Sequence, residues 1–122
     1  MDCIFCKIAS GEIPSSKIYE DDKVFAFLDI SPQSKGHTLV IPKQHFGTIY
    51  DIPEDVLVDL IKVVKNISHD IKDRLGCGGL NIKQNNGELA GQTVHHLHFH
   101  LIPRYKQEEY EIEDILATLK KV

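Results

Sequence analysis

The sequence predicts an α+β fold, in which one long helix covers one face of a five-stranded antiparallel sheet. Five short segments have the apolar or alternating composition of strands and are separated by turn-forming residues. Only one long segment in the middle of the chain repeats its apolar residues with the period of a helix. The length of 122 residues fits one domain, which we expect to span residues 1–122.

The elements are expected in the following order. Residues 3–9 form a short helical turn, ended by Ser10-Gly11 and Pro14. Three strands come before the long helix and two come after it, and runs of Val, Ile, Thr and Phe mark most of them. The expected strands are Lys17–Glu20, Val24–Leu28, Thr38–Ile41, Gly79–Gln84 and Val94–Ile102.

The long helix is expected to begin after Pro53, a residue that suits the first helical position. Gly76 marks its end, because glycine commonly stops a helix. A shorter helix is expected near the C-terminus, from the spacing of Ile112, Ile115, Leu116 and Leu119. The apolar face of the long helix consists of Val56, Leu57, Leu60, Ile61, Val64, Ile67, Ile71 and Leu75.

The composition excludes several classes of function. A net charge of −4 argues against binding of a nucleic-acid polymer, whose partners are usually basic, but a small nucleotide stays compatible with it. No apolar stretch is long enough to span a membrane, and the N-terminus lacks the pattern of a signal peptide. The expected location is therefore cytoplasmic, where thiols are reduced or bound to metal rather than bridged.

Three histidines alternate along the last expected strand. Because side chains alternate across a strand, His96, His98 and His100 share one face, about 6–7 Å apart, and the apolar residues between them face the core. A half-exposed strand with polar histidines is the simplest interpretation, but three histidines at alternate positions are difficult to attribute to chance. Two functional interpretations remain: ligands of a metal ion, or a nucleophilic imidazole that attacks phosphorus.

A polar, glycine-bearing loop precedes this strand. Asn85, Gly91, Gln92 and Thr93 supply donors or allow close approach of the backbone. Such a loop beside a nucleophile is typical of a cradle for phosphoryl oxygens, where charge develops during transfer. An ordinary hairpin connection would explain the glycines, although not their position next to three histidines.

The run His96-Leu97-His98-Phe99-His100-Leu101-Ile102 resembles the signature of the histidine triad (HIT) superfamily, in which apolar residues separate three histidines. The resemblance covers nearly the whole chain in the family's order and spacing. Its other segments are Ile4-Phe5, residues 26–32 (AFLDISP), residues 36–43 (GHTLVIPK) and Gly91-Gln92-Thr93-Val94.

The resemblance implies roles for particular residues. It implies that His98 is the nucleophile, forming a nucleotidyl-histidine at the α-phosphate, and that His100 and His37 orient it and contact phosphate. Asp29 would accept hydrogen bonds from the ribose hydroxyls. Phosphate and leaving-group contacts are implied for Asn85, Gly91, Gln92 and Thr93. Walls of a purine pocket are implied for Phe5, Ile8, Phe27, Ile30 and Leu39, although Phe5, Ile8, Phe27 and Leu39 would each suit core packing equally.

The pair Cys3 and Cys6 forms a C-x-x-C motif, which alone is compatible with a metal site, a redox pair or neither. Closing a tetrahedral zinc site needs two more ligands, for which His45 and His96 are candidates. This set resembles bacterial HIT proteins, where such a zinc ion is structural. Two reduced core cysteines and a surface His45 are the alternative, and Cys77 has no expected partner.

The resemblance also implies an assembly and an activity. HIT proteins are usually homodimers that join two five-stranded sheets into one of ten strands. The short N-terminal half resembles the purine nucleoside phosphoramidase branch, whereas Gly91–Val94 and Ile102-Pro103-Arg104 resemble the dinucleoside polyphosphate hydrolases. Hydrolysis of a purine nucleoside 5′-phosphoramidate is favoured. The alternatives are dinucleoside polyphosphate hydrolysis, a non-catalytic nucleotide-binding module, and a metal-binding protein that uses all three histidines.

Overall fold

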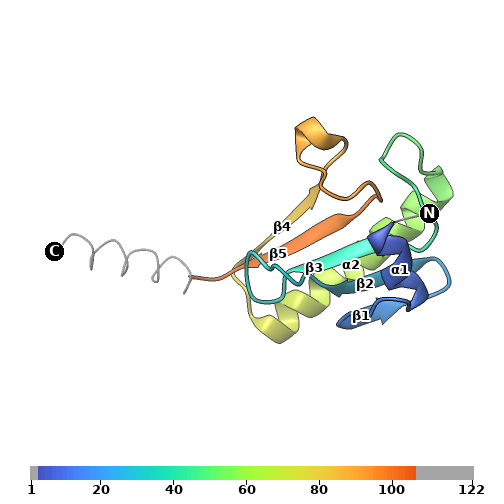
Figure 1. Cartoon of the computed structure of the whole chain (residues 1–122). Helices are drawn as coiled ribbons and strands as arrows, with labels where there is room; N and C mark the ends of the chain where they lie inside the picture. Colours follow the sequence, from blue (N-terminus) through green and yellow to red (C-terminus); the bar gives the residue numbers. More distant parts are fainter. Residues whose placement is uncertain (1–2, 107–122) are drawn as a thin grey trace, which may run out of the picture.

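The computed structural model of the chain describes residues 3–106, and it confirms an antiparallel five-stranded sheet with one long helix (Figure 1). The strands lie in the order β1-β2-β3-β5-β4. The expected C-terminal helix falls outside the described residues. The elements are α1 (Ile4–Ser10), β1 (Lys17–Glu20), β2 (Val24–Leu28), β3 (Thr38–Pro42), α2 (Glu54–Leu75), β4 (Gly79–Gln84), the 3-10 turn η1 (Glu88–Ala90) and β5 (Phe99–Arg104).

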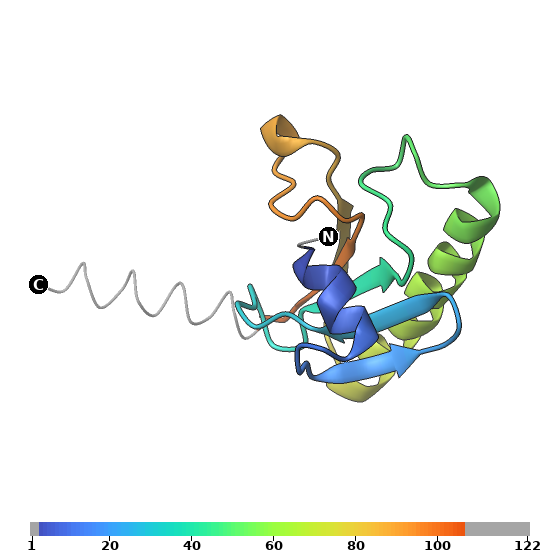
Figure 2. The same cartoon turned by 45° about the vertical axis from the view of Figure 1, so that its right-hand side comes forward.

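Helices α1 and α2 cover opposite faces of the sheet, as Figure 2 shows. Strands β2 and β3 are buried on both faces, which explains why their sequences are continuous apolar runs rather than alternating ones. On the face of α2, Val24, Ala26 and Val40 join the main core. The other face packs against α1 through Phe25, Phe27, Leu39 and Ile41.

Helix α2 confirms the helical period of the sequence. It follows Pro53, and Gly76 ends it with a left-handed φ of 63°. One residue predicted on its apolar face, Ile61, is 44% exposed. Val63, which was not predicted on that face, is buried. Ile61 lies at the margin of the stripe, toward the open edge of the sheet. No helix among residues 3–106 has the length and apolarity to cross a membrane.

The last strand differs from the prediction, because it runs from Phe99 to Arg104 rather than over Val94–Ile102. Strand pairing sets both limits. Neither neighbouring strand pairs with residues before Phe99, whose partners are Val40 of β3 and Gln84 of β4. Beyond Ile102, β4 still offers partners, and Gly79 pairs with Arg104.

Side chains alternate between the two faces already before Phe99, although the backbone there forms no strand pairing. Leu97, Phe99 and Leu101 belong to the core beneath α2, as predicted. His96 and His98 are buried on the face of α1 and contact the ring of Phe5 edge-on. The sequence therefore gives the correct face for the histidines and an incorrect boundary for the strand.

Candidate active site and metal cluster

His98 carries a free lone pair on Nε2, because a backbone carbonyl fixes its tautomer. Its Nδ1 lies 2.8 Å from the carbonyl oxygen of His96, and a carbonyl only accepts, so Nδ1 carries the proton. The side chain is 4% exposed, and burial lowers its pKa, which keeps the ring neutral at pH 7. A neutral imidazole with an unprotonated Nε2 is the form that attacks phosphorus.

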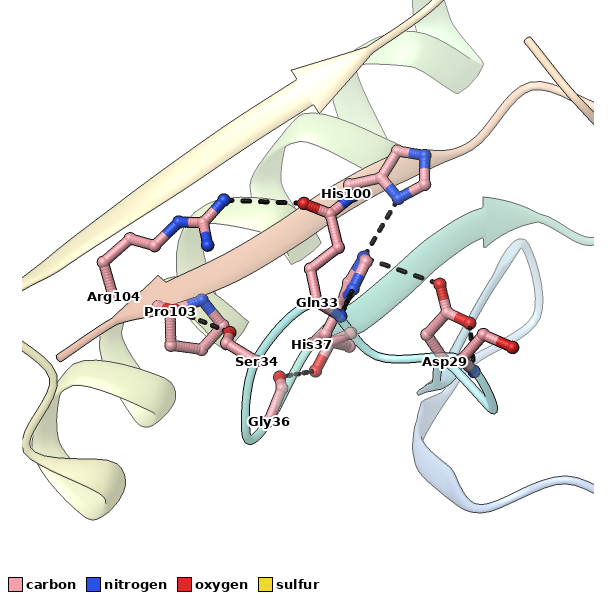
Figure 3. A network of polar contacts seen from close by, with 10 residues as sticks. Asp29, Gln33, Ser34, Gly36, His37, His100, Pro103 and Arg104 are labelled. Carbon is pink, nitrogen blue, oxygen red and sulfur yellow. Dashed lines mark hydrogen bonds and ion pairs between the residues drawn. The ribbon is translucent and has the colours of Figure 1, made fainter. Parts of the chain in front are cut away.

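His100 is fixed in the opposite tautomer by a relay through His37 (Figure 3). The backbone N–H of Gln33 donates to Nδ1 of His37 over 3.1 Å, so the His37 proton lies on Nε2. That Nε2–H donates to Nδ1 of His100 over 3.0 Å, which leaves His100 protonated on Nε2. Burial lowers the pKa of both rings, that of His100 to about 4, so the relay holds neutral rings. His98 thus presents a lone pair and His100 a donor.

Asp29 lies beside this relay with one oxygen uncommitted. Its Oδ1 accepts the backbone N–H of Ser31 over 2.9 Å. Its Oδ2 is 3.6 Å from Nε2 of His37, whose single proton points to the nearer His100. Asp29, His37 and His100 are close enough to surround a cation. The tautomers disfavour a cation, because Nε2 of His37 has no free lone pair and Nδ1 of His100 is already an acceptor.

The loop of residues 29–37 is fastened to the end of β5 (Figure 3). The hydroxyl of Ser34 donates to the Pro103 carbonyl over 2.6 Å, and the Tyr105 hydroxyl donates to the Lys35 carbonyl. Arg104 donates to the Gln33 side chain over 3.5 Å. The sequence analysis missed these residues, because only the folded loop brings them next to β5.

The predicted purine pocket is partly assembled. One cluster between α1 and the sheet contains the buried side chains of Phe5, Ile8, Phe27 and Leu39. The rings of Phe5 and Phe27 meet edge-on with centroids 5.6 Å apart. Ile30 is 93% exposed and lies outside this cluster. The structure therefore places four of the five apolar residues together, with Ile30 beside Asp29 at an open surface.

The residues of the loop before His96 that were predicted to contact phosphate differ in their exposure and in their hydrogen bonds. Thr93 is exposed and Asn85 half-buried, with a long contact of 3.4 Å from the Asn85 amide to the Gly91 carbonyl. The nitrogen and the oxygen of the buried Gln92 side-chain amide both form hydrogen bonds with backbone groups. Its Nε2 donates to the Gly47 carbonyl over 2.6 Å, and its Oε1 accepts the N–H of Gly87 over 2.8 Å. In this conformation Gln92 holds two loops together.

Cys3, Cys6, His45 and His96 form the second cluster predicted from the sequence, and their ligand atoms all lie within 4.8 Å of one another. The Cys3 Sγ and His96 Nδ1 are 3.3 Å apart, and the Cys6 Sγ and His45 Nδ1 are 3.4 Å apart. Zinc bonds of about 2.3 Å to sulfur and about 2.0–2.1 Å to nitrogen separate these atoms by about 3.6 Å at a tetrahedral angle. The four groups therefore fit a tetrahedral zinc ion.

The surroundings prepare these residues as ligands. His96 is fully buried and donates its Nε2–H to the Pro42 carbonyl over 2.7 Å, which leaves the Nδ1 lone pair for a metal. Burial lowers the pKa of His96 to about 4. Burial and the Cys3 thiol raise the pKa of Cys6 to about 11, so the metal-free thiol keeps its proton, which a zinc ion would displace.

The fold and site together define an α+β protein with neutral histidines at alternate positions, of which His96 and His98 are buried just before the interior strand β5. The HIT domain model matches residues 10–107, and the chain belongs to the HIT family.

The chain is 55% identical to an uncharacterised HIT-like protein of Methanocaldococcus jannaschii over 104 residues, 85% of this chain and 80% of the relative. It is 47% identical to an adenosine 5′-monophosphoramidase of Candida albicans over 106 residues, 84% of this chain and 70% of the relative. A zinc-bound histidine triad family protein from Mycobacterium smegmatis has a similar crystal structure, with a TM-score of 0.83 and 41% identity, covering 87% of this chain and 77% of that one.

Proposed function

We propose that this HIT-family hydrolase cleaves purine nucleoside 5′-phosphoramidates and releases the nucleoside monophosphate. The observation that carries the proposal is the tautomer of His98, whose Nε2 lone pair is free while its Nδ1 is bound to the His96 carbonyl. The adenosine 5′-monophosphoramidase of Candida albicans, at 47% identity, supports the choice of an amine as the leaving group.

The reaction takes two displacements. Nε2 of His98 attacks the α-phosphorus while the leaving nitrogen takes a proton from solvent, and the P–N bond breaks to release the neutral amine. Water then attacks the same phosphorus, the bond to His98 breaks, and the water proton is released. The His100 Nε2–H suits a phosphoryl oxygen, where negative charge develops, and Thr93 and Asn85 add donors from the loop.

The nucleoside occupies the side of the site nearest α1 and β3. The uncommitted Oδ2 of Asp29 accepts from the ribose hydroxyls, and the purine packs against the cluster of Phe5, Ile8, Phe27 and Leu39. Apolar walls hold a purine face without a strong choice between adenine and guanine.

A zinc ion, when held by Cys3, Cys6, His45 and His96, supplies structural cross-linking rather than chemistry. All four protein ligands would be used, which leaves no open position for substrate. Cys3 caps α1 and Phe5 follows it, so the ion would join the wall of the purine pocket to the triad.

The chain pairs with a second copy through β4. This strand lies at the edge of the sheet, and next to it Ile61 and Ile82 are 44% and 52% exposed beside an apolar groove between α2 and β4. Pairing of two β4 edges would bury this surface and give a sheet of ten strands. Sedimentation should therefore give the mass of two chains, and a single-chain mass at micromolar concentration would refute the pairing.

A small substrate panel tests the reaction. The purified protein is incubated with adenosine and guanosine 5′-phosphoramidates, a dinucleoside polyphosphate and a nucleoside monophosphate as a binding control. We expect release of the monophosphate from the phosphoramidates at the highest kcat/KM. Faster cleavage of the dinucleoside polyphosphate would favour the alternative hydrolase, and binding of the monophosphate without any turnover would favour a non-catalytic module.

A further inference from the structure

Lys83 of β4 lies directly across from His100 of β5 and has no role in the proposed reaction. The two residues are partners in the antiparallel ladder, so their side chains leave the sheet on the same face. Directly opposed residues have Cβ atoms about 4.5–5.5 Å apart, and a lysine reaches several ångströms further on its flexible stem. Its ammonium can therefore extend over the His100 ring toward the triad.

The ammonium of Lys83 is uncommitted. The side chain is exposed, and within residues 3–106 it makes no hydrogen bond or ion pair. Arg104, the neighbouring cation on this face, is by contrast engaged with Asn81 and with Gln33. The field of Lys83 already reaches the site, because it adds to burial in lowering the pKa of His37 and of His100.

The order of the strands places Lys83 on the leaving-group side. Strand β5 lies between β3 and β4, so His100 lies between the loop that carries Asp29 and His37 and the strand that carries Lys83. A nucleotide with its ribose at Asp29 and its α-phosphorus at His98 extends its leaving group away from β3, toward β4. Pairing of β4 with a second copy would use backbone groups, so the side chain of Lys83 would stay on the face of the site.

We propose that Lys83 selects substrates whose leaving group carries a negative charge, such as the carboxylate of an amino acid joined to the α-phosphorus through its nitrogen. This inference rests on the proposed phosphoramidase function and names the class of its leaving group. Neutral and cationic amines gain nothing from this contact. An attraction between exposed charges is screened by solvent and salt, so we expect a preference of about tenfold that weakens as ionic strength rises.

A matched pair of substrates tests the inference. The adenosine 5′-phosphoramidates of glycine and of glycinamide have the same scissile bond and differ in the terminal carboxylate. The measured quantity is the ratio of kcat/KM for the glycine compound to that for the glycinamide compound. We expect Lys83→Gln to lower this ratio about tenfold and Lys83→Arg to preserve most of it.

Lys62→Gln provides the control, because it removes the same charge from an exposed position on α2, which covers the opposite face of the sheet. It should leave the ratio as in the wild type. An unchanged ratio in Lys83→Gln, with both substrates cleaved, overturns the role of Lys83 and leaves the phosphoramidase function intact. If the wild type cleaves neither substrate nor the unsubstituted phosphoramidate, the proposed function fails and the inference falls with it.

Discussion

Replacing His98 with alanine is expected to lower kcat for phosphoramidate hydrolysis by at least about 10,000-fold, because it removes the proposed nucleophile. The only Nε2 lone pair aimed into the site by a fixed tautomer belongs to this residue among residues 3–106, whereas His100 presents a proton and His96 turns toward the cysteines. Affinity for the nucleoside monophosphate should change by only a few-fold, because the proposed purine and ribose contacts lie on other residues.

Two further measurements distinguish a nucleophile from a general base. A rapid quench of the wild type should trap a nucleotide on His98 through an acid-labile P–N bond. Two successive displacements should also retain the configuration of a chiral α-phosphorus, whereas direct attack by water would invert it. Inversion, or label on another residue, would exclude the histidine intermediate.

His95→Ala is the matched control for the His98 variant. His95 lies three residues before His98, is exposed, and lies against Gly47 outside the group formed by His37, His98 and His100. It should retain most of the wild-type kcat. Turnover by His98→Ala near the wild-type rate would contradict the mechanism directly.

The sequence predicted those parts of the fold that local patterns determine. The bounds of β1, β2 and β4 agree with the prediction, and α2 runs from the residue after Pro53 to Leu75, because turn residues and a proline mark these limits in the sequence itself. The start of β5 was wrong because it depends on where its backbone first pairs with β3 and β4. Such a limit is a property of three strands together, and no local pattern contains it.

For the site, too, the sequence predicted what local patterns determine and missed what distant segments determine together. Alternation was sufficient to place His96, His98 and His100 on one face. The C-x-x-C motif, together with the resemblance to the HIT family, was sufficient to select the four members of the cysteine–histidine cluster. They could not assign tautomers, because each is set by a backbone group brought close by folding, such as the N–H of Gln33. The backbone partners of Gln92 are likewise invisible until the two loops meet.

Removal of zinc is expected to lower the melting temperature of the protein by about 10 °C or more. A ligand present at about a thousand times its dissociation constant stabilises the folded state by about 4 kcal/mol, and each kcal/mol corresponds to about 4 °C in a domain of this size. The ion would join α1 to His45 and His96, which lie far apart in the sequence. Metal analysis and melting curves before and after chelation measure the effect.

Loss of the ion should also weaken nucleotide binding. Cys3 caps α1, where its sulfur accepts the N–H of Cys6, and Phe5 of the same helix contacts the rings of Phe27 and His98. A loosened α1 would thus displace Phe5 from the proposed purine pocket, whereas the His98 tautomer would persist because a backbone carbonyl fixes it. We therefore expect KM to rise more than kcat falls in Cys3→Ser.

Cys77→Ser separates this effect from the general loss of a thiol. Cys77 is free and lies beside the groove between α2 and β4, outside the cluster. The Cys3→Ser protein should lose its zinc and melt at the temperature of the chelated wild type, whereas Cys77→Ser should keep both the metal and the wild-type melting temperature. Wild-type protein that is purified without chelator and contains no zinc would end the hypothesis.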